Sequence, residues 1–242
     1  MVLNRTYWFA GALLVWARLM ALGGEHRDIE FARPDGVPLL LDAVIPEGKG
    51  PFPAAILVHG GGWEAGDKRE YIHFLFEPLT RGGIAWFSIN YRLAPKHQFP
   101  AQADDADAAI AWVKANAAKF NVDPNQLTLI GESAGGHIAS YVAAKKDHRL
   151  AGVVSLYGVH DFVARTAVMG SVGRNVEQLL GVTRLTAATS ERLRTASPIA
   201  WVRQGMPPFL MVHGTEDKGV PFSQSVEMCA AMRRLTNACE VY

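Results

Sequence analysis

The sequence predicts an α/β protein with a mostly parallel central sheet and helices on both of its faces. Short apolar runs typical of buried strands alternate with longer helical patterns along most of the chain, as they do in parallel sheets. Two of these runs, Ala54–Val58 and Leu127–Ile130, end in glycine-rich turns. A chain of 242 residues with 49% hydrophobic composition is long enough to bury one sizeable core.

Residues 1–24 differ from the rest of the chain. Asn4 and Arg5 precede an apolar stretch, and small residues close the segment at Ala21–Gly24. This pattern is typical of a secretory signal peptide, and its apolar stretch is too short for a membrane-spanning helix. We therefore expect a signal peptide at 1–24, one folded domain at 25–242 and a secreted or periplasmic protein. Arg18 interrupts the apolar run, so an amphipathic helix on a cytoplasmic protein is the alternative.

Charge and cysteine content narrow the possible partners. Lys and Arg number 24 against 23 Asp and Glu, a net charge of +1, so we expect neither nucleic acid nor a membrane as a partner. Cys229 and Cys239 are too few for a disulfide framework or a zinc site. We expect each to be a small, partly buried residue, with a bridge in an oxidising compartment as the alternative. The oligomeric state cannot be read from the sequence.

The remaining elements follow in order. A hairpin is predicted first, with strands at Asp28–Ala32 and Pro38–Ile45. Later strands are predicted at Ala54–Val58, Ile84–Ile89, Leu127–Ile130, Gly152–Tyr157 and Pro207–Val212, and helices at Glu70–Leu79, Asp104–Phe120, His137–Lys145 and Phe222–Leu235. The acidic residues Asp104, Asp105 and Asp107 fall in the first turn of a helix, where carboxylates favour the helix dipole, and we do not interpret them as a metal site. Between His160 and Trp201 the strand–helix alternation is lost.

The turn after Leu127–Ile130 reads Gly-Glu-Ser-Ala-Gly at residues 131–135, and a helical pattern follows it at once. A serine hydroxyl becomes an effective nucleophile when it is held at an exposed, strained point that a base can reach. Glycines at both ends of the turn lack the Cβ atoms that would clash as the chain bends. Ser133 is therefore the candidate nucleophile. The N–H of Ala134, at the start of the helix, is a candidate donor to a developing oxyanion.

The strand Ala54–Val58 runs into His-Gly-Gly-Gly-Trp at residues 59–63. Glycines here let the backbone approach a substrate oxygen with no side chain in the way. We expect the N–H groups of Gly61 and Gly62 to complete an oxyanion hole with Ala134. Trp63 is a candidate for the wall of the substrate pocket, where a flat ring suits a sugar or an aromatic acyl group. A core tryptophan is an equally good interpretation.

These two motifs, each following a buried-type strand, resemble those of the α/β-hydrolase superfamily. Together with Gly66-Asp67-Lys68 they look like the branch of bifunctional feruloyl and acetyl-xylan esterases, which shares its HGGG and GxSxG motifs with hormone-sensitive lipase. The resemblance covers about residues 28–242. It implies an α/β-hydrolase fold in which residues 160–201 form a small cap above the active site and Asn90–Pro95 is scaffold beside it.

The same resemblance implies a function. Ser133 would attack an ester carbonyl, and water would hydrolyse the resulting acyl-enzyme. The expected substrates are acetyl or feruloyl esters of plant polysaccharide or similar small esters, and neither a metal nor an organic cofactor is implied. The Gly-Thr-Glu-Asp turn at 214–217 is similar to the acid loop of the superfamily, and the match places the triad acid at Asp217. Glu216 fits that position less well.

The resemblance also implies a catalytic histidine in a later loop, but no histidine follows His213. His59 and His213 are structural in the family pattern, and His137 lies one helical turn beyond Ser133, where we expect it to point away from the hydroxyl. His160, which we place near the pocket rim, is the remaining candidate base. We expect the chain to be a C-terminal truncation of a longer enzyme, with uncovered sheet surface and an open strand edge.

Two other functions remain possible at this stage. A missing base favours an inactive hydrolase-fold protein used for binding, although the intact Ser133, Asp217 and glycine loop argue against it. A peptidase or amidase would share every motif described above, because one fold carries many functions. Relative turnover of ester and amide substrates separates these possibilities.

Overall fold

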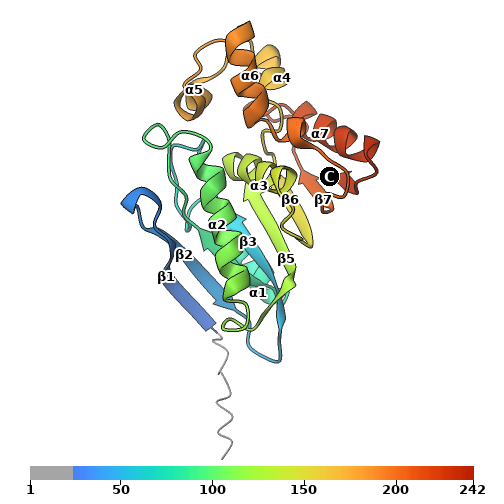
Figure 1. The fold of residues 1–242 in the computed structure, drawn as a ribbon. Helices are drawn as coiled ribbons and strands as arrows, with labels where there is room; N and C mark the ends of the chain where they lie inside the picture. The colour runs from blue at the N-terminus through green and yellow to red at the C-terminus, as the bar shows by residue number, and fades with distance from the viewer. Residues whose placement is uncertain (1–23) are drawn as a thin grey trace, which may run out of the picture.

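The computed structural model describes residues 24–242, so all but the last residue of the predicted signal peptide lie outside the described residues. Eight strands form one sheet in the order β1-β2-β4-β3-β5-β6-β7-β8 (Figure 1). The strands are β1 Gly24–Ala32, β2 Leu39–Ile45, β3 Phe52–Val58, β4 Ala85–Ile89, β5 Val122–Glu132, β6 Gly152–Leu156, β7 Phe209–Val212 and β8 Cys239–Val241. β2 pairs antiparallel with β1 and β4, and all other neighbours are parallel. The predicted α/β-hydrolase fold with a mostly parallel sheet is confirmed.

Seven α-helices connect these strands in the described part of the chain. They are α1 Phe76–Arg81, α2 Ala101–Ala115, α3 Ala134–Lys145, α4 Phe162–Met169, α5 Arg174–Leu180, α6 Ala187–Ala196 and α7 Ser223–Arg234, with 3-10 turns at Pro34–Gly36, His73–Leu75 and Pro198–Trp201. The helix predicted at Glu70–Leu79 begins only at Phe76. Tyr71, at φ 57°, is in the left-handed region, so a turn occupies the first part of that range. None of the described helices is long and apolar enough to cross a membrane.

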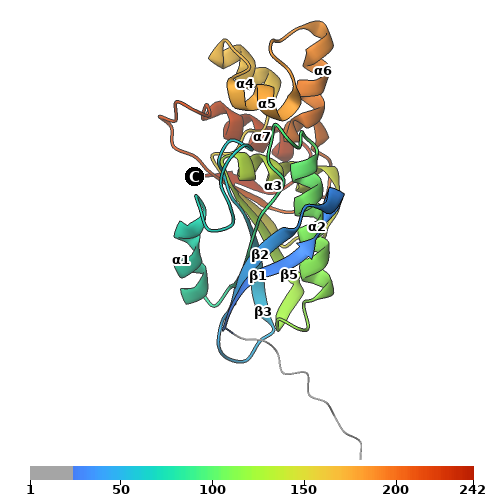
Figure 2. The ribbon, with the colours of Figure 1, turned by 90° about the vertical axis from the view of Figure 1, so that its left-hand side faces the viewer.

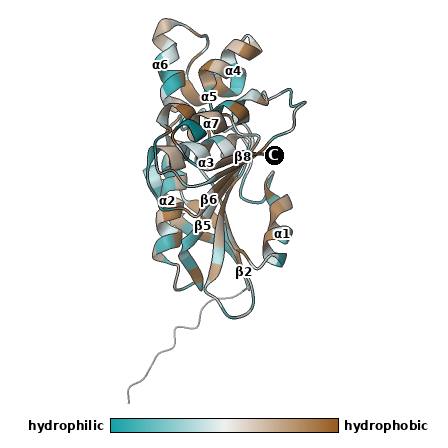
Figure 3. Ribbon diagram, turned by 90° about the vertical axis from the view of Figure 1, so that its right-hand side faces the viewer, coloured by the Kyte–Doolittle hydropathy of each residue, from teal (hydrophilic) through white to brown (hydrophobic). Residues whose placement is uncertain are grey.

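The helices divide unequally between the two faces of the sheet. α2, α3 and α7 cover one face and α1 covers part of the other (Figure 2). The larger core lies under the first group, and the strands between the layers are apolar (Figure 3). On the opposite face Phe76 of α1 stacks on Trp86 with ring centroids 4.1 Å apart, beside Ile130 and Leu57.

Part of the second face is uncovered in the described residues. A groove of about 630 Å³ runs over β6, β7 and β8, and Val154, Leu210 and Glu240 are among its lining residues. Leu210 is 38% exposed there. Uncovered sheet surface at this end of the sheet was expected from the sequence.

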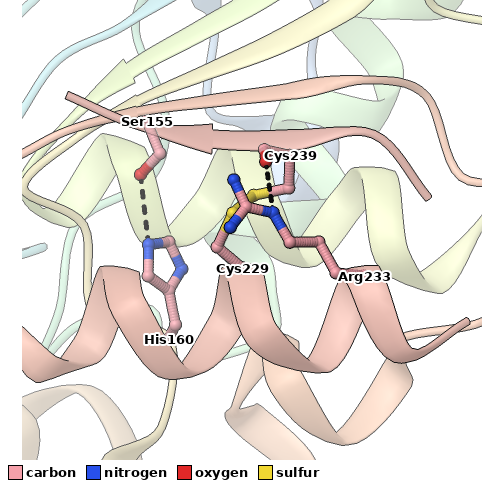
Figure 4. Close-up of a disulfide and its surroundings, with 5 residues drawn as sticks. All are labelled: Ser155, His160, Cys229, Arg233 and Cys239. Carbon is pink, nitrogen blue, oxygen red and sulfur yellow. Dashed lines mark hydrogen bonds between the residues drawn. A yellow bond between two sulfur atoms is a disulfide. The ribbon is translucent and has the colours of Figure 1, made fainter. Parts of the chain in front are cut away.

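The two cysteines form a disulfide, which corrects the expectation that they are unpaired. Cys229 of α7 and Cys239 of β8 are joined with their Cα atoms 5.4 Å apart (Figure 4). The chain turns between α7 and β8, and Arg233 Nε donates to the carbonyl of Cys239 at 2.8 Å, so the strand returns alongside the helix. A spacing of ten residues does not by itself reveal this return.

Candidate active site

Parallel strands bring the three predicted loops to one edge of the sheet. β5 lies between β3 and β6, with Val58 opposite Gly131, and β7 follows β6, with Leu156 opposite Val212. The glycine loop, Ser133 and the acid loop therefore all leave the carboxyl ends of neighbouring strands, where ligands bind in open α/β sheets. The short helices α4, α5 and α6 of residues 160–201 lie beyond this edge (Figure 1).

Ser133 occupies a strained turn between β5 and α3. Its backbone has φ 52° and ψ −112°, and its N–H donates to the Leu156 carbonyl at 2.8 Å. A Cβ on Gly131 would lie 2.1 Å from the carbonyl oxygen of Gly135, and a Cβ on Gly135 would lie 2.0 Å from that of Val58. The two glycines of the motif are therefore required by close backbone contacts, and these contacts hold a serine conformation that is costly by itself.

The glycine loop presents backbone donors toward the same edge. Gly61 and Gly62 have φ of 95° and 62°, and the Gly61 carbonyl accepts from the N–H of Ala65 at 3.0 Å. A Cβ on Gly61 would lie 2.1 Å from the Ala65 carbonyl oxygen. Within residues 24–242, no protein acceptor takes the N–H of Gly61, Gly62 or Ala134. Three free donors at one edge are what an oxyanion hole requires.

The rings of Tyr91 and His59 hold the glycine loop in place. The Tyr91 hydroxyl lies 3.0 Å from the carbonyl oxygens of both His59 and Gly60, and the His59 ring stacks on Tyr91 at 4.2 Å. His59 Nδ1 donates to the Gly60 carbonyl at 2.8 Å. Because a peptide unit is planar, holding the Gly60 carbonyl also fixes the direction of the Gly61 N–H on the other side of the same peptide. Asn90–Pro95 thus acts as scaffold through Tyr91.

Glu132, inside the nucleophile motif, is a site residue that the sequence reasoning did not single out. Its side chain is buried and reaches the glycine loop, so that a Cβ on Gly60 would lie 1.8 Å from Oε2. That oxygen has no hydrogen-bond partner among the described residues. Burial raises the pKa of Glu132. A side chain at position 60 would therefore displace the Glu132 carboxylate from its place beside the glycine loop.

Trp63 is a core residue and does not line a pocket, which corrects one of the two sequence interpretations. It is 2% exposed, and its Nε1 donates to Nδ1 of His137 at 3.1 Å. His137 Nε2 in turn donates to the carbonyl of Ala196, at the end of α6, at 2.9 Å. His137 points away from the Ser133 hydroxyl, as expected, and links the glycine loop to the segment above it.

The acid loop distinguishes its two carboxylates. Asp217 Oδ1 accepts from the N–H groups of Gly219 and Val220 at 2.7 and 2.9 Å, and the side chain is 26% exposed. The side chain of Glu216 is 88% exposed and faces Lys218. Asp217 is therefore the acid that the fold holds in place. Its Oδ2 atom lies 3.7 Å from His213 Nε2 and accepts no hydrogen bond within residues 24–242.

His160 is not at the pocket rim, so its candidacy as the base is not supported. It is fully buried beneath the sheet edge, where its Nε2 lies 3.4 Å from Ser155 Oγ (Figure 4). The backbone N–H of His160 donates to the side-chain carbonyl of Gln224 on α7. His213 is similarly occupied by Ser225 and the Val220 carbonyl. No histidine among residues 24–242 hydrogen-bonds the Ser133 hydroxyl.

Three buried histidines make the fold sensitive to acid. Burial lowers the pKa of His59 and His137 to about 4 and that of His160 to about 3. Their unfolded pKa is about 6.5, so the unfolded chain takes up protons first as the pH falls. We expect stability to be complete above about pH 6.5 and to decline toward pH 4, by on the order of 3 kcal/mol per histidine at its limit. Urea unfolding at pH 7 and pH 5 measures this, and an equal unfolding free energy at both would contradict it.

Two of the three acidic residues of α2, Asp105 and Asp107, are used in ion pairs. Arg92 pairs with Asp105 at 2.8 Å and with Asp35 at 2.6 Å, and Asp107 faces Lys146 and His148. Across residues 24–242 no group of three His, Cys, Asp or Glu side chains is arranged to hold a metal ion. The helix begins at Ala101, three residues earlier than expected, so only Asp104 lies in its first turn, and Asp105 and Asp107 are held by ion pairs instead.

The family model BD-FAE matches residues 41–232, a range that contains all three loops of the site. The chain belongs to the BD-FAE family. The α/β-hydrolase resemblance deduced from the HGGG and GxSxG motifs is therefore confirmed.

Relatives of this BD-FAE chain include two from Mycobacterium tuberculosis. "Probable carboxylic ester hydrolase LipM" is 30% identical over 90% of the chain and 51% of the relative. "Esterase LipC" is also 30% identical, over 78% of the chain and 50% of the relative. The chain thus spans about half the length of these curated relatives.

Solved structures with the same fold include a truncated form of a carbohydrate esterase from gut microbiota. Its TM-score is 0.81 at 23% identity, and the match covers 90% of the BD-FAE chain and 86% of that structure. Esterase 2 of Thermogutta terrifontis, phosphoramylated by tabun, has a TM-score of 0.74 at 25% identity, with 90% and 82% covered. At these identities the comparison concerns the fold.

Proposed function

We propose that this chain is the core of a serine carboxylester hydrolase. The observation that carries the proposal is a strained Ser133 at the same sheet edge as three backbone N–H groups, those of Gly61, Gly62 and Ala134, that no acceptor of residues 24–242 takes. Membership of the BD-FAE family and the ester-hydrolase names of the relatives support it.

In the proposed reaction, Ser133 Oγ attacks the ester carbonyl and the carbonyl oxygen becomes an oxyanion held by the three N–H groups. Collapse of this intermediate releases the alcohol and leaves an acyl-serine. Water then attacks the acyl-serine through a second oxyanion and releases the acid. Because these donors are fixed by the loop geometry before substrate arrives, they stabilise the oxyanion without reorganisation.

Asp217 would act through a histidine, by accepting its Nδ1 proton and stabilising the imidazolium. The hydroxyl proton of Ser133 goes to that histidine and is passed on to the leaving alcohol. Since no histidine of residues 24–242 hydrogen-bonds Ser133, the base is not assigned to any of them. The resemblance of the motifs to feruloyl and acetyl-xylan esterases favours acetyl and feruloyl esters as substrates.

Added imidazole tests the proposal independently of the base. We expect hydrolysis of 4-nitrophenyl acetate by the chain, measured against Ser133→Ala as the background, to increase with imidazole concentration. We expect little turnover of 4-nitroacetanilide, and ethyl ferulate tests the larger acyl group. Turnover equal to that of a folded Ser133→Ala protein at every imidazole concentration would overturn the proposal. Faster cleavage of the anilide would favour the amidase alternative.

We also propose that the protein is exported. The Cys229–Cys239 disulfide supports this proposal, because disulfides persist in oxidising compartments and are rare in the cytosol. Residues 1–24 fused to a reporter that is active only after export should give signal. A silent fusion whose cytoplasmic control is expressed would contradict export.

A further inference from the structure

Arg165 of α4 carries a buried positive charge with neutral partners. The residue is 8% exposed, and its Nη1 and Nη2 donate to the carbonyls of Val172 and Gly219 at 3.0 and 3.3 Å. Its Nε has no hydrogen-bond partner among residues 24–242. Burial lowers the pKa of Arg165, as expected for a cation in a poorly solvated position.

Other buried cations of the described chain are neutralised by carboxylates. Arg92 is paired with Asp105 and Asp35, and Lys68 lies 2.7 Å from Asp28. No carboxylate of residues 24–242 lies within 4.0 Å of the Arg165 guanidinium. A buried charge without a counter-charge is costly, and the cost falls when an anion binds beside it.

Arg165 lies near the acid loop, and a residue of the next helix lies near the glycine loop. Gly219 lies in the acid loop, two residues beyond Asp217. On the other side, a Cβ on Gly173 would lie 3.4 Å from Arg165 Nη1 and 3.6 Å from Asn175 Oδ1. Asn175 Nδ2 is in turn 3.2 Å from the Cβ position of Gly62 in the glycine loop. The guanidinium thus contacts the acid loop directly, and Asn175 of α5 lies between Gly173 and the glycine loop.

We propose that Arg165, with Asn175 of the next helix, forms a subsite for a carboxylate carried by the ester substrate. The proposal rests on the proposed esterase function and adds a substrate class to it. One guanidinium balances one negative charge, which fits a carboxylate better than a phosphate monoester of nearly two charges. Each Nη atom has a second N–H beyond the one used in its carbonyl contact, so a carboxylate can be held end-on. An acetylated sugar acid and the half-ester of a dicarboxylic acid both carry this group.

Paired substrates decide whether the carboxylate is recognised and on which side of the ester. The first pair compares the turnover of 4-acetoxybenzoate with that of neutral 4-acetoxybenzamide, so the charge lies on the alcohol. The second pair compares the 4-nitrophenyl half-ester of glutarate with neutral 4-nitrophenyl pentanoate, so the charge lies on the acyl group. We expect one charged ester to exceed its neutral partner by about 10- to 100-fold in kcat/KM, the range of a charge-assisted hydrogen bond. In Arg165→Met this ratio should fall to about one, whereas Arg165→Lys should keep part of it.

The control is Arg184→Met, which removes an exposed arginine from the same insertion and should keep the ratio. Titration calorimetry with benzoate and glutarate measures the subsite without turnover, and Arg165→Met should lose that binding. If no ester is hydrolysed at any imidazole concentration but Arg165-dependent binding is found, the esterase proposal fails and the subsite stands. A wild-type protein that neither prefers a charged ester nor binds either carboxylate overturns the subsite. An unchanged ratio of charged to neutral ester turnover in Arg165→Met also overturns the subsite. If the methionine variant does not fold, Arg165→Ala takes its place in this test.

Discussion

Gly135→Ala is expected to lower the free energy of unfolding by about 3 kcal/mol or more. The added Cβ would lie 2.0 Å from the carbonyl oxygen of Val58, so that α3 and β3 must move apart. The contact is with backbone, which cannot rotate away as a side chain can. Since α3 begins at Ala134, the same displacement would turn the Ala134 N–H away from the oxyanion position and lower activity.

Gly214→Ala is the matched control, because nothing lies within 4 Å of its Cβ position. Urea unfolding of both variants should show a change of no more than about 0.5 kcal/mol for the control, which is typical of a surface substitution. Equal stabilities of the two variants would mean that the close approach of α3 to β3 is not rigid.

His137→Phe is the second substitution with a large expected effect. The ring nitrogens of His137 accept from Trp63 Nε1 and donate to the Ala196 carbonyl, and all of these groups are buried. Phenylalanine fills the space but leaves one donor and one acceptor without partners, at a cost of about 2–4 kcal/mol for the pair. We also expect faster amide hydrogen exchange in residues 59–67, because Trp63 would no longer be tied to α3.

Two variants with amide side chains separate the two hydrogen bonds of His137, one to Trp63 and one to Ala196. In His137→Asn the shorter side chain reaches only the place of the histidine Nδ1 atom, so it can keep the bond to Trp63. In His137→Gln the longer side chain reaches the place of the Nε2 atom and can keep the bond to Ala196. Exchange in residues 59–67 should therefore remain slow in the asparagine variant and become fast in the glutamine variant, at comparable overall stabilities. Equal exchange in the two would mean that His137 only fills space. Trp63→Phe combined with each variant gives the coupling between the two residues.

The fold was predictable because its determinants are local and repeated. Apolar runs of strand length alternate with helical patterns from Ala54 onward, and this alternation indicates a parallel sheet wherever it occurs. The start of α1 was wrong by six residues, since Tyr71 adopts a left-handed backbone that no apolar periodicity signals. The Cys229–Cys239 bridge was only the alternative interpretation, because it depends on the path of the chain between α7 and β8.

At the candidate site, the motif residues were easier to predict than their neighbours. Ser133, Gly61, Gly62, Ala134 and Asp217 meet at one edge because each follows a parallel strand, although their catalytic roles stay predictions. His160 was misplaced, and Trp63 was left undecided between pocket and core, because the sequence shows that a residue lies near the end of a strand but not which way its side chain points. Glu132 could have been found from its position within the motif. Arg165 and Asn175 lie in an insertion without periodicity, so no pattern marked them.

The sequence by itself determined the fold class, the order along the chain of the loops that follow the strands, and the glycines at which a side chain would clash with the backbone. These features are local, because a missing Cβ and a strand-to-helix turn each depend on a few neighbouring residues. The tertiary structure decided which polar side chains face the site. Tyr91 reaches the glycine loop and Asn175 lies beside Gly62 only through packing between segments distant in the chain. Burial of Arg165 and His137 likewise depends on the helices that cover them, and burial is what turns an ordinary arginine or histidine into a group with a defined partner or the need of one.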